Sequence, residues 1–219
     1  LFPFKFHLIF SDTIFDFVDG YYNFKAGNER TKVYIKDGYD LFINLDVVDF
    51  DESIRFTGIG SHENNYLAQK YLNTENSNEM SFYKLNETEF LNKIDSLSIS
   101  KRNYLESITK NVKEIDNNFV VKEKGDVFYF APLAKENFER YNNYFNKTED
   151  FKVSEKFYDY RKTVSLENNQ LLDVETYSKY VETFIENNVV ENDSTEHAFS
   201  KLRVINTNIK DNKLKKEFI

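Results

Sequence analysis

The sequence has no cysteine and no tryptophan, and it contains one methionine, two prolines and six glycines among its 219 residues. Without cysteine, the chain has no disulfide, no thiolate nucleophile and no sulfur ligand for a metal, so it performs no thiol redox chemistry itself. No hydrophobic run approaches the roughly 18 apolar residues that cross a bilayer, and no membrane-spanning helix is predicted. These absences exclude several classes of function but leave the cellular compartment open.

Acidic residues outnumber basic ones by 37 to 29, and the formal net charge is −8. The basic residues are scattered along the chain, so no nucleic-acid-binding surface is predicted. The chain has no tryptophan and one methionine, but it has 22 Phe and 15 Tyr. Because aromatic side chains bury large apolar areas, we expect a core built mostly from rings.

Turn-forming residues are concentrated in the first quarter of the chain, and Gly125 is the one glycine after Gly60. Short β-favouring runs recur at residues 4–10, 21–25, 31–35, 41–45 and 54–57. The pairs between them, such as Asp37-Gly38, tolerate the positive φ angles that tight antiparallel turns require. The pattern predicts a small antiparallel β unit, either a meander or a small sandwich, over residues 1–60.

After Gly60 the hydrophobic period changes from two to about 3.6, which predicts a helical unit over residues 61–219. Asn86 and Glu89 have the spacing of a capping box at the start of a long helix. Pro132 is expected to kink or interrupt the helix that contains it. Expected helices lie at residues 61–71, 86–108, 119–145, 154–163, 174–188, 195–209 and 211–219. The predicted fold class is α+β, with a small antiparallel sheet or sandwich followed by a larger all-helical unit.

One connection is rich in carboxylates and is a candidate cation site. It contains Asp46, Asp49, Asp51 and Glu52. Hard cations need converging carboxylates, but the connection lacks the alternating ligands, central glycine and terminal Glu of an EF-hand. A solvated connection between two strands is the preferred interpretation, and a calcium site is the alternative hypothesis.

No catalytic or cofactor motif stands out. His7, His62 and His197 are far apart, and none has the two-histidine helical spacing of a zinc site. Residues 58–61 are neither a nucleophile elbow nor a P-loop, and they lack the third glycine of a dinucleotide fingerprint. A Ser-His-Asp triad stays open, because its members can lie far apart in the sequence. We therefore assign no catalytic, metal-binding or cofactor-binding residue.

Aromatic residues cluster on two adjacent predicted helices, and two interpretations of them stay open. Rings at helical spacing usually pack in the core. Alternatively, an exposed group of rings stacks on a glycan or a peptide, and a contiguous exposed patch would favour this role. The candidate ligand-binding rings are Tyr141, Tyr144, Phe157, Tyr158 and Tyr160.

Three segments of the first third of the chain form a recognisable set, namely residues 33–41 (VYIKDGYDL), 49–60 (DFDESIRFTGIG) and 63–67 (ENNYL). Together they resemble the region that precedes the thioredoxin domain in TlpA-like envelope proteins of Bacteroidota. In that family, a β-rich segment with a Gly-Asp-Leu turn and a Phe-Thr-Gly-Gly strand is followed by helices and then by the thioredoxin domain. Residues 90–97 and 151–160 are similar but less specific, so the resemblance extends over most of the chain.

The chain departs from the family in one respect that matters for activity. The redox activity of the family resides in a Cys-x-x-Cys pair at a helix start, and no position here corresponds to it. The resemblance therefore implies a segment of a longer protein, with residues 210–219 leading into a thioredoxin-like domain. The absence of an initiating Met fits this expectation.

The first functional hypothesis is a non-catalytic accessory and interaction domain of such a protein. The resemblance implies a periplasmic or outer-membrane location, a parent anchored through a lipid, and contacts to a protein partner, to its own thioredoxin-like domain or to a second copy. The alternative is an aromatic-lined glycan- or peptide-binding module of the cell envelope. An unrecognised hydrolase ranks last, since it would need a pocket with converging His, Ser or acidic groups.

Overall fold

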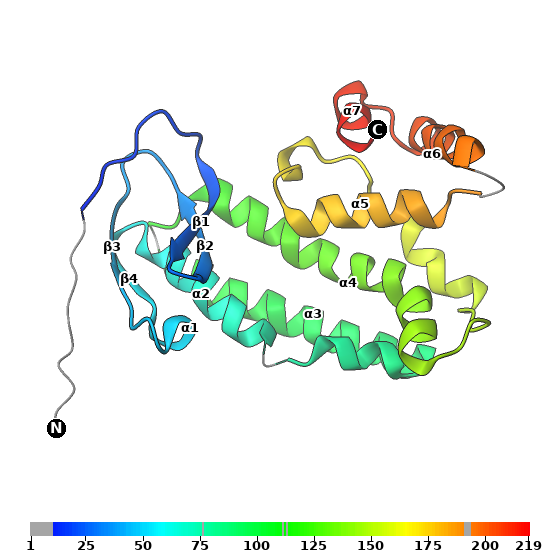
Figure 1. The fold of residues 1–219 in the computed structure, drawn as a ribbon, viewed down its shortest axis with the longest axis horizontal. Helices are drawn as coiled ribbons and strands as arrows, with labels where there is room; N and C mark the ends of the chain where they lie inside the picture. The colour runs from blue at the N-terminus through cyan, green and yellow to red at the C-terminus, as the bar shows by residue number, and fades with distance from the viewer. Residues whose placement is uncertain (1–10, 76, 111, 113, 191–193) are drawn as a thin grey trace.

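The computed structural model describes residues 11–75, 77–110, 112, 114–190 and 194–219 (Figure 1). Strands come first and helices follow, which confirms the predicted α+β class. The β part contains β1 (Gly20–Ala26), β2 (Glu29–Ile35), β3 (Asp40–Asn44), α1 (Phe50–Ser53) and β4 (Arg55–Ile59). The helical part contains α2 (Ser61–Glu75), η1 (Glu79–Lys84), α3 (Glu87–Thr109), α4 (Asn117–Asn146), η2 (Glu155–Lys162), η3 (Asn169–Leu171), α5 (Glu175–Asn187), α6 (Ser194–Asn208) and α7 (Asn212–Phe218). The expected strand at residues 4–10 lies outside the described residues.

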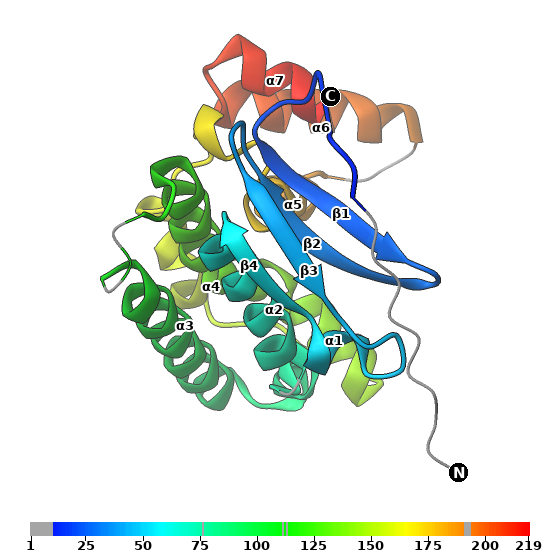
Figure 2. The same cartoon turned by 90° about the vertical axis from the view of Figure 1, so that its left-hand side faces the viewer.

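The four strands of the described residues form two antiparallel pairs, β1 with β2 and β3 with β4, whereas the sequence predicts one meander or sandwich. The β1–β2 turn is tight, with Ala26 facing Glu29 and a φ of 63° at Gly27. The longer connection between β3 and β4 contains α1, a one-turn helix that the sequence pattern does not indicate. The two pairs lie side by side over α2 (Figure 2).

Two consecutive asparagines at the start of α2 bind the backbones of β2 and β4. Asn64 accepts from the amide N of Tyr34 at 2.8 Å and donates to its carbonyl O at 2.9 Å. Asn65 does the same for Phe56 of β4, at 2.9 and 2.8 Å. Because each asparagine satisfies a strand donor and a strand acceptor, α2 joins the two strand pairs.

α4 is the central helix of the molecule and lies between α3 and α5 (Figure 1). Phe138 stacks on Phe90 of α3, with ring centroids 3.8 Å apart. Tyr129 packs edge-on against Tyr177 of α5, with centroids 4.9 Å apart. Phe119, near the start of α4, is fully buried against the β part. Of the 30 buried hydrophobic residues in the described ranges, 14 are aromatic, so rings form about half of the core by number and not most of it.

α4 and α5 run in the same direction. Thr176, in the first turn of α5, donates to Asp126, and Asn187, the last residue of α5, donates to Glu136 further along α4. The segment between the two helices therefore returns along the bundle before α5 begins. It contains η2 and η3, which pack against α4.

Two helix predictions differ from the structure in detail. Pro132 lies inside α4 without interrupting it, because packing against α3 and α5 compensates for the hydrogen bond that proline removes. The helix expected at residues 154–163 is a 3₁₀ helix, η2. Residues three apart share a face in a 3₁₀ helix, so Phe157 and Tyr160 both point toward α4.

The capping prediction at the start of α3 is confirmed, since the Asn86 side chain accepts from the amide N of Glu89 at 3.0 Å.

Gly125 allows η3 to approach α4 closely. A Cβ atom at this position would lie 2.6 Å from both Cδ atoms of Leu171, which is 3% exposed. We expect Gly125→Ala to lower the free energy of unfolding by about 1–2 kcal/mol, because crowding in a packed core outweighs the better helix propensity of alanine. Urea denaturation followed by circular dichroism measures the change. A variant as stable as the wild type would contradict the close packing.

Candidate functional site

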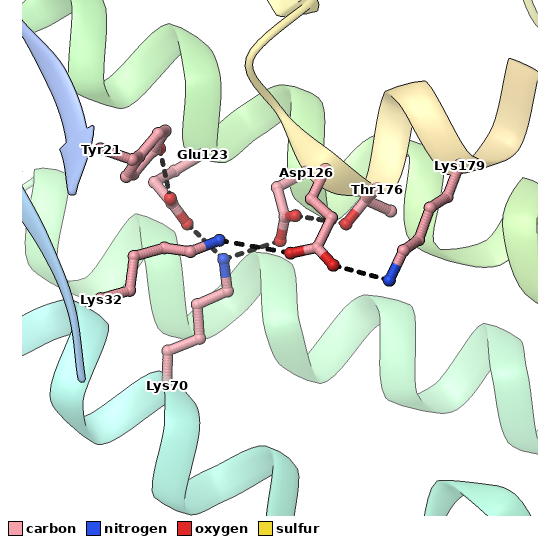
Figure 3. Close-up of polar contacts among 8 residues, drawn as sticks. Tyr21, Lys32, Lys70, Glu123, Asp126, Thr176 and Lys179 are labelled. Atoms are coloured by element: carbon pink, nitrogen blue, oxygen red, sulfur yellow. Dashed lines mark hydrogen bonds and ion pairs between the residues drawn. The ribbon is translucent and has the colours of Figure 1, made fainter. Parts of the chain in front are cut away.

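A network of charges, buried at its centre and exposed at its edge, lies where the β part meets the helices (Figure 3). Its centre is Lys70 of α2, whose Nζ lies 2.6 Å from Oε2 of Glu123 and 2.7 Å from Oδ2 of Asp126. The two carboxylates are three residues apart on α4, a spacing that places both on one helix face. The side chain of Glu123 is 2% exposed and that of Lys70 is 26% exposed, so both are largely removed from water.

Donors from three other elements complete this network. The hydroxyl of Tyr21 on β1 donates to Oε1 of Glu123 at 2.5 Å, and the hydroxyl of Thr176 on α5 donates to Asp126. Nζ of Lys32 on β2 lies 3.6 Å from Glu175, which also accepts from Lys179 at 2.6 Å. We call this network the charged junction. It consists of Tyr21, Lys32, Lys70, Glu123, Asp126, Glu175, Thr176 and Lys179.

The surroundings of Lys70, Asp126 and Tyr21 move the pKa of each group away from neutral pH. Burial alone would lower the pKa of Lys70, but the negative charges of Glu123 and Asp126 outweigh it and raise that pKa. Burial would raise the pKa of Asp126, yet Lys70 and the Thr176 hydroxyl lower it overall. Burial and then the charge of Glu123 raise the pKa of Tyr21. A general acid or base needs a pKa near the working pH, so Lys70, Asp126 and Tyr21 are suited to joining elements and not to proton transfer.

The lowered pKa of Asp126 predicts a pH dependence of stability. Its folded-state pKa lies below the ordinary value of 3.8, so ionised Asp126 stabilises the fold above about pH 4, and this contribution is lost as the pH falls through the folded-state pKa. We expect Asp126→Asn to lower the melting temperature at pH 7, and the difference from the wild type to shrink between pH 4 and pH 2. The exposed Asp150→Asn serves as the control. A difference that stays constant down to pH 2 would contradict the assignment.

A second network joins α4 to the returning segment. The side chain of Glu136 is fully buried and accepts from the Tyr160 hydroxyl at 2.6 Å. It also accepts from Nε and Nη2 of Arg161, at 2.7 and 2.5 Å, and from Nδ2 of Asn187 at 2.8 Å. All four donors are directed at one carboxylate, so Glu136 holds η2 and α5 against α4.

A groove of about 450 Å³ adjoins the charged junction, on the face of α4 between η1 and α5. Thr176 and Lys179 belong to both features. The groove is lined by Glu79 and Tyr83 of η1, by Phe130, Leu133, Ala134, Asn137, Arg140 and Tyr141 of α4, and by Thr176, Lys179 and Thr183 of α5. Its volume is in the range of small-molecule and peptide pockets, and its lining combines three rings and two aliphatic side chains with six polar or charged residues.

The five rings singled out from the sequence do not form one exposed patch. Phe157 is 5% exposed and packs in the core, and Tyr158 is half-buried. Tyr160 donates its hydroxyl to a buried carboxylate. Tyr144 is 74% exposed, whereas Tyr141 is half-buried and lines the groove. The structure therefore brings one of the five, Tyr141, to the candidate site, and a ligand-binding role for these rings stays a prediction.

The other candidates from the sequence lie apart from the groove. His62 is exposed at the start of α2, and His197 of α6 lies 3.6 Å from Glu186 of α5; His7 lies outside the described residues. In the acidic connection, the Ser53 hydroxyl accepts from the amide N of Asp46, which closes the turn before β4. Within the described ranges, no group of three or more His, Asp or Glu residues could hold a metal ion.

No sequence motif marks the residues of the charged junction. One signal for it is that Lys70 follows Tyr66 and Leu67 by four and three residues, and so shares the buried face of α2. A lysine on a buried face indicates an acidic partner, because an unpaired buried charge is costly. The identity of that partner, 53 residues away on α4, is not contained in the local pattern.

Comparison of the chain with protein-family models, with curated proteins and with solved structures found no match. In the part of the chain that the structure describes, no helix combines the length and apolar character needed to cross a membrane.

Proposed function

We propose that this chain is a non-catalytic accessory and interaction domain. The observation that carries the proposal is the use of its ionisable groups. Lys70 forms ion pairs with both Glu123 and Asp126, and Glu136 accepts from four donors. These groups stabilise the contacts between elements, and the chain has no cysteine for nucleophilic or redox chemistry.

The resemblance to TlpA-like envelope proteins supplies the biological context of the proposal. In that context the chain is the segment before a thioredoxin-like domain, and it supplies partner recognition, positioning or dimer contacts. Its partner is another protein, the thioredoxin-like domain of the same chain or a second copy. The parent is then a periplasmic or outer-membrane protein anchored through a lipid, and a thiol-disulfide oxidoreductase.

The coding sequence downstream of Ile219 tests the family part of this proposal. A Cys-x-x-Cys pair within the next hundred or so residues, the usual size of a domain, would support it. A stop codon directly after Ile219 would overturn it. The non-catalytic part is tested by assaying the purified chain against ester, peptide and phosphate substrates. Turnover that is abolished by a single substitution in the groove would overturn it.

A second candidate function is an aromatic-lined module that binds a glycan or a peptide. One observation favours it, namely that Tyr83, Phe130 and Tyr141 all line the groove between η1 and α5. Aromatic side chains provide large contact areas at low entropic cost, which makes them common in binding sites. This candidate and the first are compatible, because an interaction domain needs a surface that recognises its partner.

A further inference from the structure

The groove between η1 and α5 is elongated. Its α4 residues, from Phe130 to Tyr141, recur at spacings of three and four, so they form one stripe along the helix. At about 1.5 Å per residue, this stripe is roughly 16 Å long. An extended peptide rises about 3.3 Å per residue, so the stripe matches some five residues of an extended chain. The floor of the stripe is apolar where Leu133 and Ala134 lie.

The charges around the groove favour an anionic ligand. The acidic lining residue, Glu79, is paired with Lys101 of α3 at 2.9 Å. Lys179 has Glu175 as its partner. Arg140 is exposed, and its Nη2 donates to the neutral amide oxygen of Asn137 at 2.6 Å. Among the described residues, no carboxylate forms an ion pair with Arg140, so no such pair offsets its positive charge, in a chain of net charge −8.

The surroundings of Arg140 suit recognition of a carboxylate. Its guanidinium carbon lies 4.8 Å from the centre of the Tyr141 ring, and this stacking orients the planar group. A guanidinium presents paired N–H donors that match the two oxygens of a carboxylate. Tyr141 in turn packs edge-on against Tyr83, with centroids 4.9 Å apart, which holds the stack at one end of the groove.

The rest of the groove suits a peptide backbone and an apolar side chain. Thr183 lines it with a hydroxyl that makes no hydrogen bond to any described residue, and so it can bind a peptide group. Phe130 lies at the other end, with Nζ of Lys101 4.6 Å from its ring centre. Phe130 and Leu133 offer apolar contact to a side chain about 10–15 Å from Arg140, three to four extended residues away.

We propose that this groove binds an extended acidic peptide, with a carboxylate on Arg140 and an apolar side chain over Phe130 and Leu133. The inference rests on the proposed function, since it names the class of partner that an interaction domain of this shape recognises. The carboxylate comes from an Asp or Glu side chain or from the carboxyl terminus of the partner. Both sources present the same two oxygens to the guanidinium.

Three acetylated pentapeptides test the proposal and distinguish the two sources of the carboxylate. The first is Phe-Gly-Gly-Asp-Gly with an amidated end, the second is Phe-Gly-Gly-Asn-Gly with a free terminal carboxylate, and the third is the Asn peptide with an amidated end. Titration into ¹⁵N-labelled protein measures binding. We expect at least one of the first two to bind with a dissociation constant of about 0.1–1 mM, and the third at least tenfold more weakly.

Variants of the protein assign the binding to Arg140. We expect Arg140→Gln to weaken binding of the acidic peptide about tenfold, and Arg140→Lys, which keeps the charge but loses the paired donors, about threefold. The matched control is Arg203→Gln on the exposed side of α6. The melting temperatures of the variants establish that they fold, which the exposure of Arg140 leads us to expect.

Four results would overturn the proposal. One is equal binding of acidic and neutral peptides, and another is unchanged binding by Arg140→Gln. The third is saturation of the groove by an oligogalacturonate while the peptides leave it unperturbed, which would assign it to a glycan. Absence of any peptide binding at 5 mM would also overturn it, but the non-catalytic interaction function would stand, because its own tests are the downstream gene sequence and the lack of turnover.

Discussion

Glu136→Ala is expected to lower the free energy of unfolding by about 3–5 kcal/mol, the range observed when one partner of a buried ion pair is removed. The Glu136 carboxylate is fully buried and accepts hydrogen bonds from Tyr160, Arg161 and Asn187. Without it, the guanidinium of Arg161 would remain between the rings of Tyr158 and Phe184, at 4.0 and 5.1 Å, with no counter-charge. Aromatic faces offset only part of that loss.

Urea denaturation followed by far-UV circular dichroism measures this effect. Glu136→Gln should fall between the wild type and Glu136→Ala, because an amide keeps one acceptor oxygen but loses the charge. The exposed Glu182→Ala on α5 is the matched control, and we expect its change to stay within about 0.5 kcal/mol. A change of less than about 1 kcal/mol in Glu136→Ala would mean that η2 is held to α4 mainly by its rings.

Lys70→Met is also expected to lower the free energy of unfolding by about 3–5 kcal/mol. Here the substitution removes a cation and leaves anions unpaired, whereas Glu136→Ala removes an anion and leaves a cation unpaired. Lys70 is the cation that lies between Glu123 and Asp126, and Glu123 is 2% exposed. Methionine has a similar length but no charge, so two neighbouring carboxylates would be left without their counter-ion. Because Tyr21 of β1 is also bound to Glu123, the loss should loosen the β part first.

Hydrogen exchange monitored on the amides of β1 and β2 tests whether the loss is local. We expect these amides to lose more protection in Lys70→Met than those of α3 and α5. The exposed Lys93→Met on α3 is the control. Adding Glu123→Gln to Lys70→Met should recover part of the stability, because it removes one of the two unpaired charges. Uniform loss of protection, or no recovery in the double variant, would contradict a local electrostatic role for Lys70.

Local sequence patterns predicted those parts of the fold that depend on neighbouring residues. The Asn86 cap and the change of period after Gly60 both predicted real helix starts. Such signals depend on backbone preferences and on the face that a helix buries, and these are properties of a short segment. The same signals indicated an α-helix where η2 is a 3₁₀ helix, because the direction in which Tyr160 must point is decided by Glu136 of another helix.

Local patterns did not predict which aromatic rings line the groove. The rings at residues 141–160 cluster in the sequence, yet Phe157 packs in the core and Tyr144 is exposed. The groove instead takes its rings from two distant elements, Tyr83 from η1 and Phe130 and Tyr141 from α4. Which ring faces a groove depends on how helices dock, and docking is set by the complementarity of whole surfaces.

The sequence by itself determined the order of strands and helices, the aromatic character of the core and the absence of thiol chemistry. These follow from composition and from local periodicity, which are present in the unfolded chain. Only the tertiary structure decided that Lys70 faces Glu123 and Asp126 and that Glu136 receives four donors. It also decided that Arg140, at the end of a groove, has no ion pair to a carboxylate of the described residues. The physical reason is that an ion pair joins residues 53 positions apart, and no local preference records which distant charge will lie within hydrogen-bonding distance once the helices pack.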